Sequence, residues 1–241
     1  MSADSTLEAI AQDIAAHREP GAVLVVGITG AIAAGKSTFA EQLGAQLHAM
    51  AQTVEIVCTD GFLMPNDKLT ELGLLDTKGF PPSYDNAALN HALTSVRTGP
   101  ADFPAYSHVT YDIDPALTRT LAAPDILIVE GLNLHHRAAS PTTRDPLDLL
   151  IYIDADEADL EAWYLARFMD LWAAAEHDPT SFYARFRTMT QAQTEDLARM
   201  VWAQVNLKNL RDHIILAKPT ADMIVRKGSD HGIEAIERGR P

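Results

Sequence analysis

Five short, largely continuous runs of apolar residues are spaced along the chain. They occupy residues 22–27, 54–58, 125–129, 149–153 and 222–225. Runs of this kind are typical of strands that are covered on both faces in a parallel sheet. Helical stretches or long loops separate them, as crossover connections between parallel strands require. The pattern therefore predicts an α/β fold with a doubly wound, mainly parallel sheet flanked by helices, in a single domain over residues 1–241.

Periodic apolar positions outside these runs predict helices. Near the N-terminus, Ser5-Thr-Leu-Glu8 matches a capping box, and a Glu-Pro-Gly sequence ends the pattern, so a short helix is expected at about 5–18. The residues that would share its apolar face are Leu7, Ile10, Ala11 and Ile14. Further helices are expected from Lys36 onward and near 86–97. The Pro- and Gly-containing stretch from about 60 to 104 is otherwise interpreted as functional loop.

The overall charge narrows the range of partners. The chain has 33 acidic and 19 basic residues, which gives a formal net charge of −14. A protein this acidic lacks the broad positive surface that binds nucleic acid or anionic membrane, so neither is an expected partner. Any anionic ligand must instead be held by a local group of cationic side chains.

The N-terminal residues and the cysteine content indicate a compartment. The sequence begins without a basic segment followed by an apolar one, and no apolar run is long enough to span a bilayer. Cys58 is the only cysteine, so it cannot form an intramolecular disulfide, and its apolar surroundings suit a buried strand. A soluble cytoplasmic protein is therefore expected.

A glycine-rich loop follows the first apolar run. Its sequence, Gly30-Ala31-Ile32-Ala33-Ala34-Gly35-Lys36-Ser37, has the spacing G-x-x-x-x-G-K-[ST] between a predicted strand and a predicted helix. In such a loop backbone N–H groups converge on phosphate oxygens, the lysine reaches the β- and γ-phosphates, and the serine hydroxyl binds Mg²⁺. Thr38 is expected to make a smaller contribution to nucleotide binding. We expect this loop to bind nucleotide phosphates, and an ordinary glycine turn is the weaker interpretation.

Acidic residues at the ends of the apolar runs are candidates for catalysis, because ligands of open α/β sheets bind beyond the carboxyl ends of the strands. Asp60 follows the second run and precedes a glycine that permits close approach, so we expect it to be the base that orients the attacking hydroxyl. Glu130 ends another run and is expected to support magnesium. Asp154 is expected to cap the following helix, with support of the metal in place of Glu130 as the alternative.

Other functions of a phosphate-binding loop are less well supported. A GTPase switch would carry Asn-Lys-x-Asp for guanine, and the sequence contains no such tetrapeptide. A regulatory protein that binds ATP without turnover stays an alternative, against which the presence of Lys36, Ser37 and Asp60 argues.

Several blocks beyond the loop carry a family resemblance. They are 59–66 (Thr-Asp-Gly-Phe-Leu-Met-Pro-Asn), 78–85 (Lys-Gly-Phe-Pro-Pro-Ser-Tyr-Asp), 106–112 (Tyr-Ser-His-Val-Thr-Tyr-Asp) and 130–133 (Glu-Gly-Leu-Asn). This series resembles the bacterial type I pantothenate kinases, P-loop kinases related to phosphoribulokinase and uridine kinase, and the likeness extends roughly from residue 22 to 234. The resemblance implies a P-loop NTPase fold, ATP and Mg²⁺ as cofactors, a small-molecule substrate and a homodimer.

The resemblance also assigns residue roles. Asp60 matches the catalytic acid, Lys36 and Arg167 stabilise charge on the phosphoryl group, and Arg185 is a weaker second cation. The residues expected to bind the substrate are Asp60, Tyr106, His108, Tyr164, Arg167, Phe182, Phe186 and Asn206. Lys227 and His231 are expected beside the nucleotide, with the imidazole stacked on adenine. A helical substrate or lid region is expected at about 156–212.

Structural interpretations compete with these roles. Aromatic residues at near-helical spacing, such as Phe182 and Phe186, are about as often core packing as ligand walls, and only the resemblance favours the pocket. A lone His108 or Arg167 is more often a solvated or hydrogen-bonded structural residue.

Two positions depart from the family pattern. The segment before the first strand, at roughly 20 residues, is shorter than the family's, so the packing of the dimer is expected to differ. Glu41 stands where the family has a basic residue that helps to hold inhibitory coenzyme A. An acid would repel a phosphate there, so weak inhibition by coenzyme A is expected.

The sequence therefore predicts an ATP-dependent kinase that phosphorylates the primary hydroxyl of pantothenate, the first step of coenzyme A biosynthesis. A related kinase acting on a nucleoside, glycerate or a sugar is the alternative within the same class.

Overall fold

A six-stranded sheet forms the centre of the protein, whose computed structural model describes residues 3–136 and 145–239. The strand order is β2-β5-β1-β6-β7-β8. Their bounds are β1 Leu24–Gly30, β2 Val54–Cys58, β5 Ile126–Glu130, β6 Leu149–Asp154, β7 Met223–Lys227 and β8 Ile233–Arg238. All neighbours pair in parallel except β7 and β8, which are antiparallel. The expected doubly wound, mainly parallel sheet and its five strands are confirmed.

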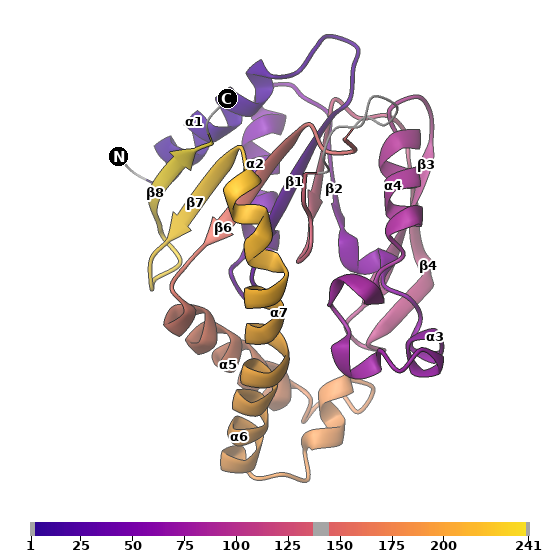
Figure 1. The fold of residues 1–241 in the computed structure, drawn as a ribbon, viewed down its shortest axis with the longest axis vertical. Helices are drawn as coiled ribbons and strands as arrows, with labels where there is room; N and C mark the ends of the chain where they lie inside the picture. Colours follow the sequence, from indigo (N-terminus) through magenta and orange to yellow (C-terminus); the bar gives the residue numbers. More distant parts are fainter. Residues whose placement is uncertain (1–2, 137–144, 240–241) are drawn as a thin grey trace.

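Helices cover both faces of this sheet (Figure 1). On one face, α2 (Lys36–Ala49) packs on β1, β2 and β5, and α1 (Ala3–Ala16) packs on α2. On the other face, the short 3-10 helix η6 (Ile214–Thr220) contacts β1 and β6. Because it is covered twice, β1 is buried at all of its residues, which explains its unbroken apolar sequence.

A separate antiparallel hairpin lies beside the β2 edge. It consists of β3 (Ala101–Ser107) and β4 (Asp112–Leu121), packed with α4 (Asn86–Ser95) and near α3 (Asn66–Glu71). Arg119 of β4 donates to the Ile56 carbonyl oxygen at 3.3 Å and pairs with Glu55, which ties the hairpin to β2. Gly61 approaches the hairpin so closely that a Cβ atom would lie 1.9 Å from the Pro104 carbonyl oxygen. The residue after Asp60 therefore has to be glycine.

Helices α5 to α7 extend beyond the carboxyl ends of the strands (Figure 1). They are α5 (Glu157–Ala174), the 3-10 helix η4 (Phe182–Phe186), α6 (Gln191–Val201), the π-helical turn η5 (Trp202–Asn206) and α7 (Leu207–Asp212). A capping box between Thr190 and Gln193 starts α6. The π turn between α6 and α7 carries Asn206, and such turns are frequent at functional sites.

Two local expectations are wrong. Helix α1 begins at Ala3, so Ser5 lies inside the first turn and is not its N-cap, because a cap residue must stand outside the helical conformation. Cys58 is exposed, since the last residue of β2 projects at the open carboxyl end of the sheet and not into a helix layer. Within 3–136 and 145–239, no helix has the length and apolar character needed to cross a membrane.

Candidate functional site

The glycine-rich loop connects β1 to α2 at the carboxyl edge of the sheet. Gly30 lies against β6, where a Cβ atom would be 2.5 Å from the Ile153 carbonyl oxygen. The loop turns through Ala33, which has a φ of 63°, and Gly35, which has a φ of 78°. Lys36 reaches back across the loop and its Nζ donates to the Ala31 carbonyl oxygen at 2.9 Å. The lysine ammonium is thus held over the loop that is expected to bind phosphates.

Lys36 is buried at the centre of a group of charges. Burial lowers the pKa of its ammonium, whereas the carboxylates of Glu130 and Asp60 raise that pKa and Arg167 lowers it further. Four of the predicted site residues therefore act on one another, although they come from α2, the loop after β2, the end of β5 and α5. A buried cation with several charged neighbours is typical of catalytic sites.

The two oxygens expected to support magnesium are in contact. Ser37 Oγ donates to Glu130 Oε1 at 2.9 Å, which brings the start of α2 to the end of β5. A hydroxyl and a carboxylate are the kind of oxygen ligands that Mg²⁺ prefers, so this pair fits the metal. No group of three or more His, Cys, Asp or Glu residues in the described ranges could hold a metal ion alone.

Asp154 has a different role from the expected helix cap, so that expectation is wrong. The N-cap of α5 is Asp156, and Asp154 instead pairs with Lys218 at 3.0 Å and Arg226 at 2.8 Å. Two cations neutralise its carboxylate and tie β6 to β7 and η6. Glu130, not Asp154, is therefore the acid beside Ser37.

Asp60 lies in a short 3-10 helix (Thr59–Phe62) directly after β2. Tyr84, which is buried, donates its hydroxyl to Asp60 Oδ1 at 3.0 Å. Burial raises the pKa of Asp60, and the negative charge of Glu130 raises that pKa further. The hydrogen bond from Tyr84 and the charges of Lys36 and His108 lower the pKa of Asp60. The carboxyl group thus has a pKa above the usual range for Asp and a fixed orientation, and both properties suit a general base.

Cys58 forms hydrogen bonds with both Asp60 and Glu130. Its sulfur accepts a hydrogen bond from the Asp60 backbone N–H at 3.5 Å, and the thiol is hydrogen-bonded to Glu130. Although Cys58 is exposed at the edge of the sheet, desolvation by the atoms packed around its sulfur and the nearby carboxylates of Asp60 and Glu130 raise the pKa of the thiol. The thiol therefore stays protonated and donates to Glu130, and a catalytic thiolate is disfavoured.

An aromatic wall, which we define as Tyr106, Tyr111, Phe182, Tyr183 and Phe186, faces this acidic end. Phe182 stacks on Tyr111 with ring centroids 3.9 Å apart and planes 17° apart. Tyr106 contacts Tyr111 and His108 edge to face, at 5.8 and 5.3 Å between centroids. The hairpin and η4 thus meet through their aromatic side chains. Most of these rings are half-buried, as a ligand-binding wall would be.

The helices behind the wall contribute polar groups. Tyr164 of α5 is hydrogen-bonded to Asn206, and its ring lies 5.6 Å from that of Trp202. Burial raises the pKa of the Tyr164 hydroxyl, which therefore stays neutral and able to donate. Phe168 packs on Tyr183 at 5.1 Å and belongs to the hydrophobic core.

Lys227 and His231 lie beside the loop. Lys227 Nζ donates to the Gly35 carbonyl oxygen at 3.4 Å, and a Cβ atom on Gly35 would lie 3.9 Å from His231 Nδ1. One face of the His231 ring is already covered by Trp163, with centroids 3.8 Å apart, so a nucleotide base can stack only on the other face. A cavity of about 300 Å³ opens here between α1, α2 and the β7–β8 turn.

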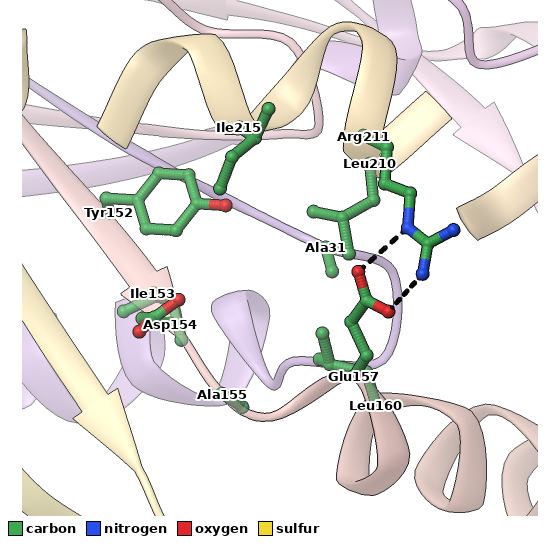
Figure 2. A pocket seen from close by; sticks show the side chains of 10 residues that line it. All are labelled: Ala31, Tyr152, Ile153, Asp154, Ala155, Glu157, Leu160, Leu210, Arg211 and Ile215. Carbon is green, nitrogen blue, oxygen red and sulfur yellow. Dashed lines mark hydrogen bonds and ion pairs between the residues drawn. The ribbon is translucent and has the colours of Figure 1, made fainter. Parts of the chain in front are cut away.

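A smaller cavity lies on a different side of the loop, between the end of β6 and α7 (Figure 2). Ala31 lines it, together with Tyr152 and the paired side chains of Glu157 and Arg211, whose closest atoms are 2.6 Å apart. Asp60, Glu130 and the aromatic wall do not line this cavity. Its volume is about 90 Å³, too small for a nucleotide, so we do not regard it as the substrate site.

Backbone strain is concentrated around the site. Of the four non-glycine residues with positive φ in the described ranges, three lie here: Ala33 in the loop, Tyr111 in the wall and His231 beside the loop, with φ of 63°, 57° and 63°; the fourth is Ala51, after α2, with φ of 60°. Such conformations are costly and occur mostly where function or surrounding contacts require them.

Thr38 is exposed on α2, as is Glu41.

Several residues of the site were not singled out from the sequence. Tyr84 and Lys78 lie in the block 78–85, and Tyr111 lies in the block 106–112, so both blocks signalled function without showing which side chains converge. Lys78 Nζ donates to Asn66 Oδ1 at 2.6 Å and lies 4.7 Å from the Tyr106 ring centroid. It thereby joins three blocks that are distant in sequence.

Comparisons with known proteins agree with this geometry. The sequence profile of the phosphoribulokinase and uridine kinase family matches residues 25–170, which include the loop, Asp60, Glu130 and Arg167. A pantothenate kinase of Rhizobium rhizogenes is 43% identical over 223 residues, 88% of this chain and 67% of that protein. One from Chelativorans sp. is 40% identical over 223 residues, 88% and 70% of the two chains. A solved kinase assigned to a fructose transport system in Silicibacter sp. TM1040 matches with TM-score 0.70 and 25% identity, over 88% of this chain and 94% of that one.

Proposed function

Since this chain belongs to the phosphoribulokinase and uridine kinase family, and within it to the pantothenate kinases, we propose that it transfers the γ-phosphoryl group of ATP to the primary hydroxyl of pantothenate. The observation that carries the proposal is the convergence of Asp60, Lys36 and Arg167 beside an aromatic wall. A base, two cations and a wall for an extended acceptor are what phosphoryl transfer to an alcohol needs.

Asp60 is the proposed base. Its carboxylate accepts the proton of the acceptor hydroxyl as that oxygen bonds to the γ-phosphorus, and ADP leaves with the electrons of the broken P–O bond. Because Tyr84 holds Oδ1, the other carboxylate oxygen is available to the acceptor. General-base assistance of this kind contributes about 10²- to 10⁴-fold to the rate.

Lys36 and Arg167 are the proposed stabilisers of negative charge on the transferred group. Lys36 comes from the loop and Arg167 from α5, so the two cations approach the phosphates from different elements. Ser37 and Glu130 are proposed to hold Mg²⁺, which would neutralise phosphate charge when bound. The remaining loop residues, namely Gly30, Ala31, Ile32, Ala33, Ala34 and Gly35, are proposed to supply backbone N–H groups.

Tyr106, His108, Tyr164, Asn206, Phe182 and Phe186 are proposed to bind the acceptor. The hydrogen bond between Tyr164 and Asn206 fixes two polar groups that can hydrogen-bond the hydroxyl and amide groups of pantothenate. On the other side, Lys227 and His231 are proposed to contact the nucleotide. The homodimer and the cytoplasmic location stay predictions; light scattering of the purified protein tests the first.

A coupled ADP-release assay with a panel of acceptors tests the proposed function. We expect turnover with pantothenate and at least about 100-fold lower kcat/KM with a nucleoside, D-glycerate and fructose. Preference for one of those acceptors would replace the proposal with a related kinase. ATP binding without turnover on any acceptor would favour the regulatory alternative. Lys36→Ala, which removes a loop cation, serves as the inactive control.

A further inference from the structure

Two arginines differ from the other described arginines because they form no ion pair with a carboxylate. In the described part of the chain, eight arginines form ion pairs with carboxylates: Arg18, Arg97, Arg119, Arg187, Arg199, Arg211, Arg226 and Arg238. Arg167 and Arg185 are the described arginines that form none. In a chain of net charge −14, an arginine without an acidic partner is unusual, and both lie at the candidate site.

These two arginines have different neighbours in the site. The charge of Arg167 acts on Lys36 in the phosphate-binding loop. Arg185 is in η4, and its guanidinium carbon lies 4.1 Å from the ring centroid of Phe182 in the aromatic wall. Arg167 is therefore suited to the phosphoryl group, whereas the contact that the structure gives for Arg185 is with the aromatic wall.

Tyr111 has both the proposed base and Arg185 among its electrostatic neighbours. Burial raises the pKa of Tyr111 to about 12, and both the negative charge of Asp60 and the positive charge of Arg185 contribute to that pKa with opposite signs. Tyr111 thus lies within electrostatic reach of the proposed base and of Arg185. An acceptor that runs along Tyr111 with its hydroxyl at Asp60 brings its other end toward Arg185.

Stacking prepares the Arg185 side chain for an anion. Tyr111 and the Arg185 guanidinium both lie about 4 Å from the Phe182 centroid, so they occupy opposite faces of that ring. Stacking leaves the in-plane N–H groups of a guanidinium free, and their spacing matches a carboxylate in a bidentate pair. Arg185 is exposed, so a ligand can reach its guanidinium from solvent.

We propose that Arg185 is a specificity residue that recognises the carboxylate at the far end of the acceptor. The proposal rests on the proposed function, because it assigns one group of pantothenate to one residue. It separates two cationic roles: Arg167 acts on the phosphoryl group, and Arg185 selects acceptors that carry an acid at the opposite end from the reacting hydroxyl.

Two acceptors that differ only at that end test the proposal. One is pantothenate and the other is the alcohol in which a hydroxymethyl group replaces the carboxylate. For Arg185→Gln, kcat/KM for pantothenate should fall by about tenfold or more through KM, with kcat nearly unchanged, whereas kcat/KM for the alcohol should change by less than about threefold. Arg185→Lys should restore part of the preference, because a lysine keeps the charge without the planar fork.

Arg187 provides a matched control on the same segment. Its guanidinium carbon lies 4.1 Å from the Trp172 ring centroid, but Glu176 pairs with it at 3.0 Å. Arg187→Gln removes a stacked arginine of the same kind and should leave the ratio of kcat/KM for the two acceptors at the wild-type value. Thermal melts of all variants verify folding.

The outcomes separate the two proposals. If wild type phosphorylates both acceptors and Arg185→Gln keeps the wild-type preference, or loses activity equally on both, the role of Arg185 is refuted while the proposed function stands. If wild type phosphorylates neither acceptor although it binds ATP, the proposed function fails, and the role of Arg185 fails with it.

Discussion

The phosphate-binding loop leaves a strand that is buried at every residue, whereas the aromatic wall opposite combines the hairpin with a 3-10 helix in which no residue is buried. The loop side is held by backbone contacts, such as the approach of Gly30 to the Ile153 carbonyl oxygen. The wall side is held by contacts between rings, such as that of Phe182 with Tyr111. One half of the site is thus fixed by the sheet and the other by side-chain packing.

This difference suggests how the two halves divide the work. Backbone N–H groups and a loop lysine recognise phosphate, which is the same in every nucleotide, and a rigid sheet edge suits that task. Side chains on short helices can be replaced without disturbing the sheet, so they suit recognition of a particular acceptor. Changes on the loop side should therefore act on kcat, and changes in the wall should act on the KM of the acceptor.

The strongest test of this division is the base. Asp60→Asn removes the proton acceptor but keeps the shape of the side chain, so kcat should fall by about 10²-fold or more while ATP affinity changes little. Steady-state kinetics and calorimetric titration with ATP measure the two quantities. Asp76→Asn, at an exposed acid outside the site, is the control. Near-normal turnover of Asp60→Asn would show that another group accepts the proton.

The next largest effect is expected at Tyr84. Tyr84→Phe keeps the buried ring and removes the hydrogen bond to Asp60, so kcat should fall by roughly tenfold. That bond lowers the pKa of Asp60 against the effect of burial, so its loss should raise that pKa and move the acid limb of kcat/KM to higher pH. Tyr152→Phe, at another buried tyrosine, is the control. An acid limb that stays in place would mean that Tyr84 does not act on Asp60.

A smaller change is expected in the wall. Phe182→Leu removes the ring that stacks on Tyr111, a contact worth about 1 kcal/mol, so the KM of the acceptor should rise by about fivefold. The kcat and the KM for ATP should stay within about twofold, and they serve as internal controls. A fall in kcat as large as that of the Tyr84 variant would contradict the division between the two halves.

The smallest effect is expected at His136, which lies at the end of the strands opposite to the site. His136 bridges Asp145 at 3.0 Å and Asp222 at 2.7 Å, and the hydrogen bond to Asp222 is the main cause that raises its pKa to about 9. A raised pKa stabilises the fold fully below about pH 6.5, and this stabilisation is lost as pH rises toward 9.

His136→Gln should remove that pH dependence, with a change of about 1 kcal/mol or less because the pair is partly screened by solvent. Urea unfolding at pH 6 and pH 10 measures it. The kinetic constants at pH 7 should equal those of wild type, since His136 lies outside both halves of the site. Equal pH dependence of unfolding in the two proteins would contradict the bridge.

The parts of the fold that were predictable are those with strong local signals. The five parallel strands have continuous apolar sequences, and α2 begins at Lys36 as the loop motif requires. The β3–β4 hairpin was not predicted because most of β4 is exposed and the pairing shifts between Phe103 and Ala105, so no alternation marks it. The last strand, β8, is a half-exposed edge with polar positions, which also hides its periodicity.

The sequence alone determined the sheet, the phosphate-binding loop and the family, because these depend on apolar runs and on motifs whose residues are adjacent in the chain. Tertiary structure decided which residues meet: Tyr84 with Asp60, Ser37 with Glu130, and Asp154 with Lys218 and Arg226 instead of a helix end. These pairs are separated by 24 or more residues. Their contacts arise only when the strands align and the helices pack, so no local pattern encodes them.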